Sequence, residues 1–200
     1  MISKKTKIGI VVFLILISSI LLYKLWDIQT RLPILNKIEE VSLESALLDE
    51  YTFDNDKVKI VAFIFTNCPD ICPMTMIDLA KMQNMLKEKG WFGERVEIVA
   101  ITLDPVIDTK EVLRKYANNF NVDPMGWHIL RGTEVQTKEV ADQFQMVFKK
   151  EENGFVTHST NMYVVDTENN IRSIHDMAIG GKQVNIDEIL ENITRLLDKN

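Results

Sequence analysis

Cys68 and Cys72 are the two cysteines of the chain, and their spacing suits chemistry that needs two sulfur atoms at one place. They lie where an apolar, strand-like run gives way to a helical pattern, and Pro73 fits the first turn of that helix. The partial positive charge of a helix amino terminus favours thiolates, which act as nucleophiles and as soft metal ligands. Two buried, inert thiols are the alternative, which the neighbouring Pro and Asp residues disfavour. The pattern predicts a disulfide or a chelated ion without choosing between them.

Of the three histidines, His158 is the candidate for a third functional group. It lies in a polar loop before a predicted strand, where an imidazole can face the cysteine turn if the two strands are neighbours. His128 is expected to be a core histidine, and His175 a solvated residue at a strand end. Two thiolates and one imidazole form a soft set that suits Cu(I) and binds Cu(II) with a further oxygen ligand. Structural zinc normally takes four protein ligands, and no fourth is evident in the sequence.

Alternating strand and helix patterns must position these groups, and they predict an α/β fold with helices on a mostly central sheet. The predicted strands cover residues 58–65, 96–103, 127–130, 161–165 and 171–175. The predicted helices run from residue 73 to before Gly90, from 108 to 120, from 133 to 144 and from 185 to 197. The predicted caps of the last three helices, each with Glu or Gln three residues later, are Asp108, Thr133 and Asn185.

The chain is expected to begin with a single-pass membrane anchor. Ile8–Tyr23 is an uncharged apolar run preceded by Lys4, Lys5 and Lys7. Basic residues ahead of a span favour a cytoplasmic amino terminus, which places the remainder outside the membrane. The run is slightly shorter than a typical span unless Lys24 snorkels to the interface. A cleaved signal peptide is the alternative, although no A-x-A-like site follows the run.

The charge of the chain changes sign at the end of this apolar run. Residues 1–26 hold four basic and no acidic residues, so the remainder carries 29 acidic against 19 basic residues. This balance excludes a typical nucleic-acid binder, and the cysteine count excludes a disulfide-stapled scaffold. We predict an anchor over residues 1–26, a tether over 27–50 and one extracytoplasmic domain over 51–200 of a cell-membrane protein.

Three motifs resemble those of the Sco/SenC proteins, membrane-anchored copper-binding assembly factors for cytochrome c oxidase. Phe65–Pro73 (FTNCPDICP) resembles the family's Thr-x-Cys-Pro-Asp-x-Cys-Pro motif, and Thr102–Thr109 (TLDPVIDT) resembles its Ser-Val-Asp-Pro-x-x-Asp-Thr segment. His158, with the serine that follows it, resembles the family's His-Ser loop. The resemblance implies a thioredoxin-like fold in which Cys68, Cys72 and His158 are the copper ligands. Phe65 and Lys110 depart from the family's usual residues, but neither departure touches a ligand position.

Two functions remain open from the sequence. The first is a metallochaperone that holds copper on reduced thiols and delivers it to the copper-accepting subunit of cytochrome c oxidase. The second is a thiol–disulfide oxidoreductase that reduces the cysteines of the target subunit or acts in redox signalling; one cysteine attacks a partner disulfide and the other resolves it. The usual redox spacing, C-x-x-C, is one residue shorter than the spacing here. The soft ligand set favours copper.

Overall fold

The computed structural model describes residues 9–10, 13–22, 31–151 and 156–198 of the chain. The chain divides into two compact units, residues 1–32 and 33–200. In the first unit, residues 9–10 and 13–22 are helical, whereas the rest of the predicted span Ile8–Tyr23 lies outside the described residues. Within the described ranges, no helix is both long and apolar enough to cross a membrane.

The second unit is built on a seven-stranded mixed sheet, which confirms the predicted α/β fold with a central sheet. Its strands, in spatial order, are β1 (Asn36–Lys37), β9 (Asn170–Asp176), β8 (Asn161–Val165), β3 (Val58–Ile64), β4 (Val96–Thr102), β5 (Trp127–Arg131) and β2 (Glu44–Ser45). The three strands β3, β4 and β5 run parallel, and the other pairs in this sheet are antiparallel. Two short strands, β6 (Phe148–Lys150) and β7 (Val156–His158), form a separate hairpin.

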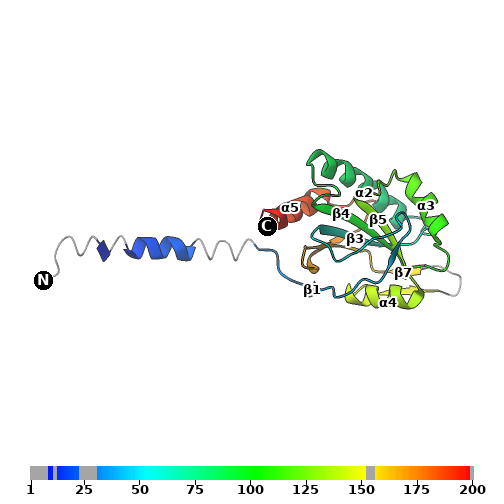
Figure 1. The fold of residues 1–200 in the computed structure, drawn as a ribbon, viewed down its shortest axis with the longest axis horizontal. Helices are drawn as coiled ribbons and strands as arrows, with labels where there is room; N and C mark the ends of the chain where they lie inside the picture. The colour runs from blue at the N-terminus through cyan, green and yellow to red at the C-terminus, as the bar shows by residue number, and fades with distance from the viewer. Residues whose placement is uncertain (1–8, 11–12, 23–30, 152–155, 199–200) are drawn as a thin grey trace. The chain divides into compact units, whose positions relative to one another are not determined.

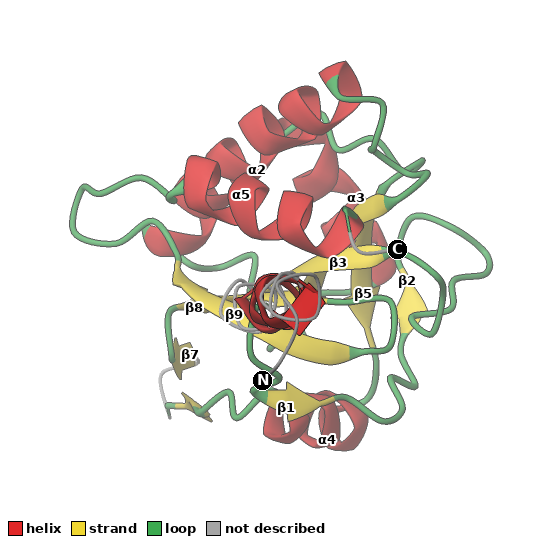
Figure 2. Cartoon of the chain, turned by 90° about the vertical axis from the view of Figure 1, so that its left-hand side faces the viewer, coloured by secondary structure: helices red, strands yellow, loops and turns green. Residues whose placement is uncertain are grey.

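Helices cover both faces of this sheet. They are α2 (Ile71–Glu88), α3 (Lys110–Asn119), α4 (Glu134–Gln143) and α5 (Ile186–Leu197). Figures 1 and 2 show α2, α3 and α5 on one face and α4 on the other. The connections β3–α2–β4 and β4–α3–β5 join parallel neighbours, so both helices cross the same face of the sheet.

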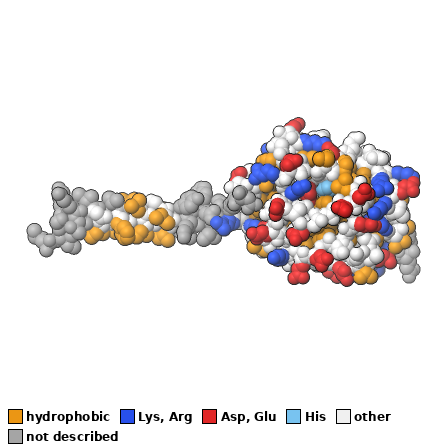
Figure 3. Space-filling view, viewed as in Figure 1, with side chains coloured by type: hydrophobic (Ala, Val, Ile, Leu, Met, Phe, Trp, Pro, Cys, Tyr) orange, Lys and Arg blue, Asp and Glu red, His pale blue; other side chains and the backbone are white. Residues whose placement is uncertain are grey.

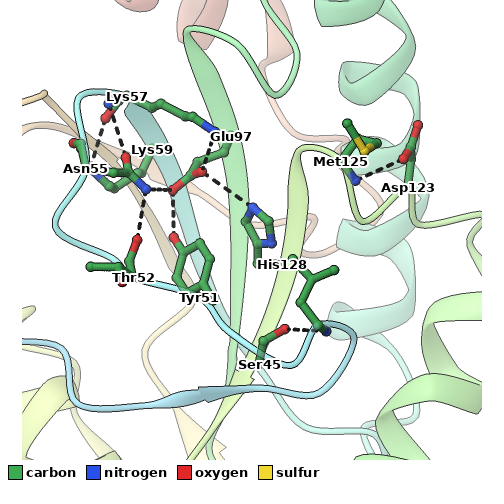
Figure 4. Close-up of polar contacts among 11 residues, drawn as sticks. Ser45, Tyr51, Thr52, Asn55, Lys57, Lys59, Glu97, Asp123, Met125 and His128 are labelled. Carbon is green, nitrogen blue, oxygen red and sulfur yellow. Dashed lines mark hydrogen bonds and ion pairs between the residues drawn. The ribbon is translucent and has the colours of Figure 1, made fainter.

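The central strands β3 and β4 form because each is a run of apolar, mostly β-branched residues that is buried along its whole length. Lys59 and Glu97 interrupt the two runs and stand opposite each other in the parallel register. The Glu97 carboxylate accepts hydrogen bonds from Tyr51 (2.6 Å) and Asn55 (3.0 Å) and lies 3.4 Å from the imidazole of His128. Figure 4 shows these side chains gathered around Glu97 at the amino ends of the strands. The prediction of a buried His128 is confirmed.

Two of the three predicted helix caps are confirmed, and one is wrong. Thr133 forms a capping box with Gln136, and the Asn185 side chain accepts a hydrogen bond from the amide of Glu188. The helix predicted to start at Asp108 is instead capped by Thr109, whose side chain accepts from the amide of Val112. Thr109 has the extended backbone of a capping residue, whereas the Asp108 side chain is buried and bonded elsewhere.

The segment predicted as a tether is in large part built into the domain. The strands β1 and β2 both lie within residues 27–50. β1 pairs with β9 and β2 pairs with β5, so these two strands form the edges of the sheet. Ile38 and Ala46, beside these strands, are 1% and 0% exposed. The second compact unit spans residues 33–200.

The surface of the domain is mixed in charge. Acidic and basic side chains are interspersed over the face drawn in Figure 3.

His175, expected to be solvated, is instead buried on β9, 2.9 Å from the hydroxyl of Ser173 and 3.4 Å from the side-chain amide of Asn192. The reason is α5, whose apolar face covers this part of the sheet and brings Asn192 to the imidazole.

Candidate functional site

The two cysteines lie on the connection from β3 into α2, at the carboxyl ends of the parallel strands. Cys68 is half-buried in the turn before the helix, and its amide donates to the carbonyl oxygen of Phe65 at 3.3 Å. Cys72 is the second residue of α2 and is buried. The helix begins at Ile71, two residues before the predicted start, so Cys72 lies inside its first turn. The amide of Cys72 points at the Cys68 sulfur, 3.4 Å away.

Hydrogen bonding gives the two thiols different pKa values. The hydrogen bond from the Cys72 thiol, with those from the amides of Cys72 and Asp70, lowers the pKa of Cys68 to about 5, although partial burial opposes the change. The same thiol–thiol hydrogen bond, together with burial, raises the pKa of Cys72 well above its ordinary value. At neutral pH the pair is therefore a thiolate at Cys68 next to a thiol at Cys72, which donates its hydrogen to that thiolate.

His158 reaches this pair from β7. Its Nε2 lies 4.0 Å from the Sγ of Cys72, and its Nδ1 lies 2.7 Å from the carbonyl oxygen of Ser159. Because a carbonyl oxygen only accepts, Nδ1 carries a hydrogen, and in the neutral imidazole Nε2 presents its lone pair to the cysteine side. The imidazole also stands edge-on to the ring of Phe65, with centroids 5.8 Å apart. A backbone carbonyl that fixes the tautomer in this way is the usual support of a histidine ligand.

Strand pairing brings this loop to the cysteine turn. β8, which follows His158 after two residues, pairs antiparallel with β3, so the start of β8 lies beside the end of β3. Met162 stands opposite Ala62, near the end of β3. The condition stated from the sequence, that the two strands be neighbours, is thus met.

Asp108 braces the cysteine turn, a role that the sequence analysis missed. Its buried carboxylate accepts from the hydroxyl groups of Thr66 and Thr102 and, at 3.2 Å, from the amide of Thr66. Burial raises its pKa, although the hydrogen bonds from both threonines act in the opposite direction. The end of β4 and the start of the cysteine turn are therefore tied to one side chain. Thr66 and Asp108 are 42 residues apart in the chain, so no local sequence pattern predicts their contact.

The three predicted ligands converge without yet forming a coordination set. In the described part of the chain, no group of three or more His, Cys, Asp or Glu side chains is arranged to hold a metal ion. The donor types still suit a soft metal, because they are a thiolate, a thiol and an imidazole with its lone pair facing the sulfurs. Of the nearby methionines, Met76 and Met82 are buried as core residues, and Met74 is 43% exposed.

Comparison with known proteins identifies relatives along most of the chain. The SCO1/SenC family model matches residues 43–198. The SCO2-like protein of Rickettsia prowazekii is 28% identical over 144 residues, which cover 66% of each chain. The mitochondrial protein SCO1 of Saccharomyces cerevisiae is 30% identical over 162 residues, which cover 76% of this chain and 52% of the yeast protein. The chain thus spans 66% or less of the length of these two relatives.

Solved structures of similar proteins share the fold. The copper-bound structure of Arabidopsis thaliana ScoI has a TM-score of 0.66 at 27% identity and covers 81% of this chain and 98% of its own. Copper-bound yeast Sco1 has a TM-score of 0.65 at 28% identity, covering 80% of this chain and 89% of its own. The central mixed sheet with its flanking helices matches these structures, as the implied thioredoxin-like fold requires. With the family model matching residues 43–198, the chain belongs to the SCO1/SenC family.

Proposed function

We propose that this protein is a copper metallochaperone that binds the metal through Cys68, Cys72 and His158. In this proposal it delivers copper to the copper-accepting subunit of cytochrome c oxidase, from a domain held outside the cell membrane by the segment Ile8–Tyr23. The observation that carries the proposal is the position of His158, whose Nε2 lone pair faces the Cys72 sulfur at 4.0 Å. The copper present in the Arabidopsis and yeast structures supports it, because both proteins share this fold.

Each donor has a defined state before copper, the cargo, arrives. Cys68 is ready as a thiolate, because its pKa of about 5 lies well below neutral pH. The imidazole of His158 is fixed by the Ser159 carbonyl with Nε2 free to bind. Cys72 alone must give up a proton, because its pKa is raised. Uptake of copper is therefore coupled to release of a proton from Cys72.

The test is a copper titration of the reduced protein. We expect Cu(I) binding with 1:1 stoichiometry in the parent, loss of binding in Cys68→Ser and Cys72→Ser, and weaker binding in His158→Ala. Thr157→Ala is the matched control, because Thr157 is the exposed neighbour on the same strand. An unchanged affinity and thiolate–copper absorption in His158→Ala would rule out the three-ligand site.

The unequal thiols favour a second candidate, a thiol–disulfide oxidoreductase. The Cys68 thiolate would attack a partner disulfide, forming a mixed disulfide and releasing one partner sulfur as a thiolate. Cys72 would then lose its proton to that thiolate and attack the Cys68 sulfur. This step closes the Cys68–Cys72 disulfide and releases the second partner sulfur, so two electrons pass to the partner.

Mixed-disulfide trapping distinguishes this candidate from copper delivery. With a reporter protein disulfide, Cys72→Ser is expected to accumulate the mixed disulfide through Cys68, while His158→Ala retains exchange. A protein that binds copper tightly but exchanges disulfides no faster than a free thiol would exclude the oxidoreductase.

The anchor is tested with the full-length protein. We expect it to remain in the membrane fraction after a wash with high salt and to leave it when Ile8–Tyr23 is deleted. Recovery of a shortened, soluble chain from cells would instead support the cleaved signal peptide.

A further inference from the structure

The hairpin that carries His158 needs an external support. β6 and β7 pair only with each other, outside the seven-stranded sheet. A two-stranded hairpin is marginally stable on its own in water, so contacts with the rest of the domain must fix where it lies. At its base, the Ser159 amide donates to the Val147 carbonyl at 2.9 Å, which closes the hairpin without attaching it to the cysteine turn.

The pairing register shows which face of the hairpin points inward. Phe148 stands opposite His158, and Lys150 stands opposite Val156. Directly opposed residues, and residues two apart on one strand, share a face, so these four side chains lie on the same side. Val156 is 1% exposed, and the His158 imidazole reaches the cysteine pair, so this is the inward face.

Lys150 is the charged residue of that inward face, and it meets a fixed partner. Its ammonium lies 2.7 Å from Oδ1 of Asp104, whose side chain is 4% exposed. Asp104 follows β4 in a tight turn, where its amide donates to the Thr102 hydroxyl at 3.1 Å and its carbonyl accepts from the amide of Asp108 at 2.8 Å. Asp108 is the residue that braces the cysteine turn. Lys150 thus ties the hairpin to the framework that holds the cysteines.

Burial of the Asp104 carboxylate separates this ion pair from an ordinary surface pair, although the Lys150 side chain itself is 37% exposed. Exposed pairs contribute little, because water and salt screen them. Removing the lysine from Asp104 would leave a carboxylate that is almost fully buried without its counter-charge, which is strongly unfavourable. The adjacent Lys149 offers the contrast: it points to the outer face, is 74% exposed and pairs with the half-exposed Glu151.

We propose that the Lys150–Asp104 ion pair positions His158 against Cys72, and thereby sets how tightly the site holds copper. The inference rests on the proposed function, and it makes Lys150 a positioning residue that acts through His158. Loss of the pair frees the hairpin to move away from the cysteine turn, and the imidazole moves with it.

Copper affinity in a double-mutant cycle tests this coupling. In the reduced full-length protein, competition with a chromophoric Cu(I) chelator should show binding weakened about tenfold in Lys150→Met, as is typical when a support of a histidine ligand is lost. Lys150→Arg should restore the affinity, and Lys149→Met should match the parent. In the His158→Ala background, Lys150→Met should have no further effect. An equal loss with and without His158, or no loss in Lys150→Met, would overturn the proposal.

A second readout does not depend on copper. In the reduced apo protein, the ring protons of Phe65 and His158 should give a nuclear Overhauser effect, because their centroids lie 5.8 Å apart. We expect it to vanish in Lys150→Met and to persist in Lys149→Met, with both variants folded by circular dichroism. Its persistence in Lys150→Met would contradict the positioning role. If the parent binds no copper but this effect still depends on Lys150, the proposed function fails while the positioning role stands.

Discussion

At the scale of single residues, the site draws its chemistry from one hydrogen bond between two sulfur atoms. The Cys72 thiol and amide lower the pKa of Cys68, and the same thiol–thiol interaction with burial raises that of Cys72, so the half-buried thiol ionises first and the buried thiol keeps its proton. Both candidate functions use this division. A partner disulfide or an incoming copper ion meets the accessible thiolate first, and the buried thiol reacts only after it loses its proton.

This division predicts unequal alkylation of the reduced protein. With a pKa of about 5, Cys68 should react with iodoacetamide at nearly its full rate at pH 6.5, where an ordinary thiol is about 1% ionised. Cys72 should react slowly across the neutral range, because its pKa is raised. Peptide mapping after timed quenching measures both rates. Cys72→Ala should move the Cys68 midpoint upward, since it removes the main stabilising donor. An ordinary midpoint for Cys68 in the parent would contradict the thiol–thiol hydrogen bond.

At the scale of elements, the Asp166 carboxylate accepts several hydrogen bonds within the turn between β8 and β9. Asp166 accepts hydrogen bonds from the Asn170 amide at 2.8 Å and from the guanidinium of Arg172 at 2.7 Å. Burial alone would raise its pKa, but the hydrogen bonds from Arg172 and Asn170 outweigh it, and the pKa is lowered. A carboxyl group whose pKa is lower in the folded state stabilises the fold above its unfolded pKa of about 4, and this contribution is lost as the pH falls through the folded value.

The measurable consequence is a pH-dependent cost of Asp166→Asn. At pH 7 we expect the variant to lose about 1.5–3 kcal/mol of the free energy of unfolding, the range for hydrogen bonds to a charged group. The difference from the parent should shrink as the pH falls below about 4, because the carboxylate of the unfolded parent is protonated first and that of the folded parent follows at its lower pKa. Urea unfolding at pH 7, 5 and 3 measures it, with the exposed Asp49→Asn as control. A cost that is constant across this range would show that the charge of Asp166 does not contribute.

The elements that could be predicted from the sequence are those with strong local patterns. The buried run of β3 and the capping box at Thr133 need no distant partner to be seen, and both are confirmed. Thr66–Asp108 and Lys150–Asp104 could not be predicted, because each contact joins segments more than 40 residues apart. The short edge strands β1 and β2 were also missed. Two residues carry no periodicity, and such strands exist only because a neighbouring strand offers its hydrogen bonds.

At the scale of the whole molecule, the two ends of the parallel strands differ in kind. At the amino ends, the buried Glu97 carboxylate accepts hydrogen bonds from the half-buried Tyr51 and Asn55, so this cluster serves the fold. At the carboxyl ends, Cys68 is half-buried and Nε2 of His158 lies 4.0 Å from the Cys72 sulfur, so potential ligands gather at this end. Ligands of α/β proteins bind outside the carboxyl ends of the strands. The candidate site follows this rule, and the Glu97 cluster belongs to the supporting end.

Mutation can test whether the folded domain includes residues before 51. If the domain began at residue 51, truncating a side chain in the preceding segment would leave its stability unchanged. Ile38 is 1% exposed beside β1, so Ile38→Ala should lower the free energy of unfolding by about 2–4 kcal/mol, the usual cost of such a cavity. Ile34→Ala is the matched control, because Ile34 is 62% exposed. If the two variants were equally stable in urea, residues 27–50 would act as a tether, as the sequence predicts. A loss confined to Ile38→Ala would show that residues before 51 are required to complete the sheet that positions Cys68, Cys72 and His158.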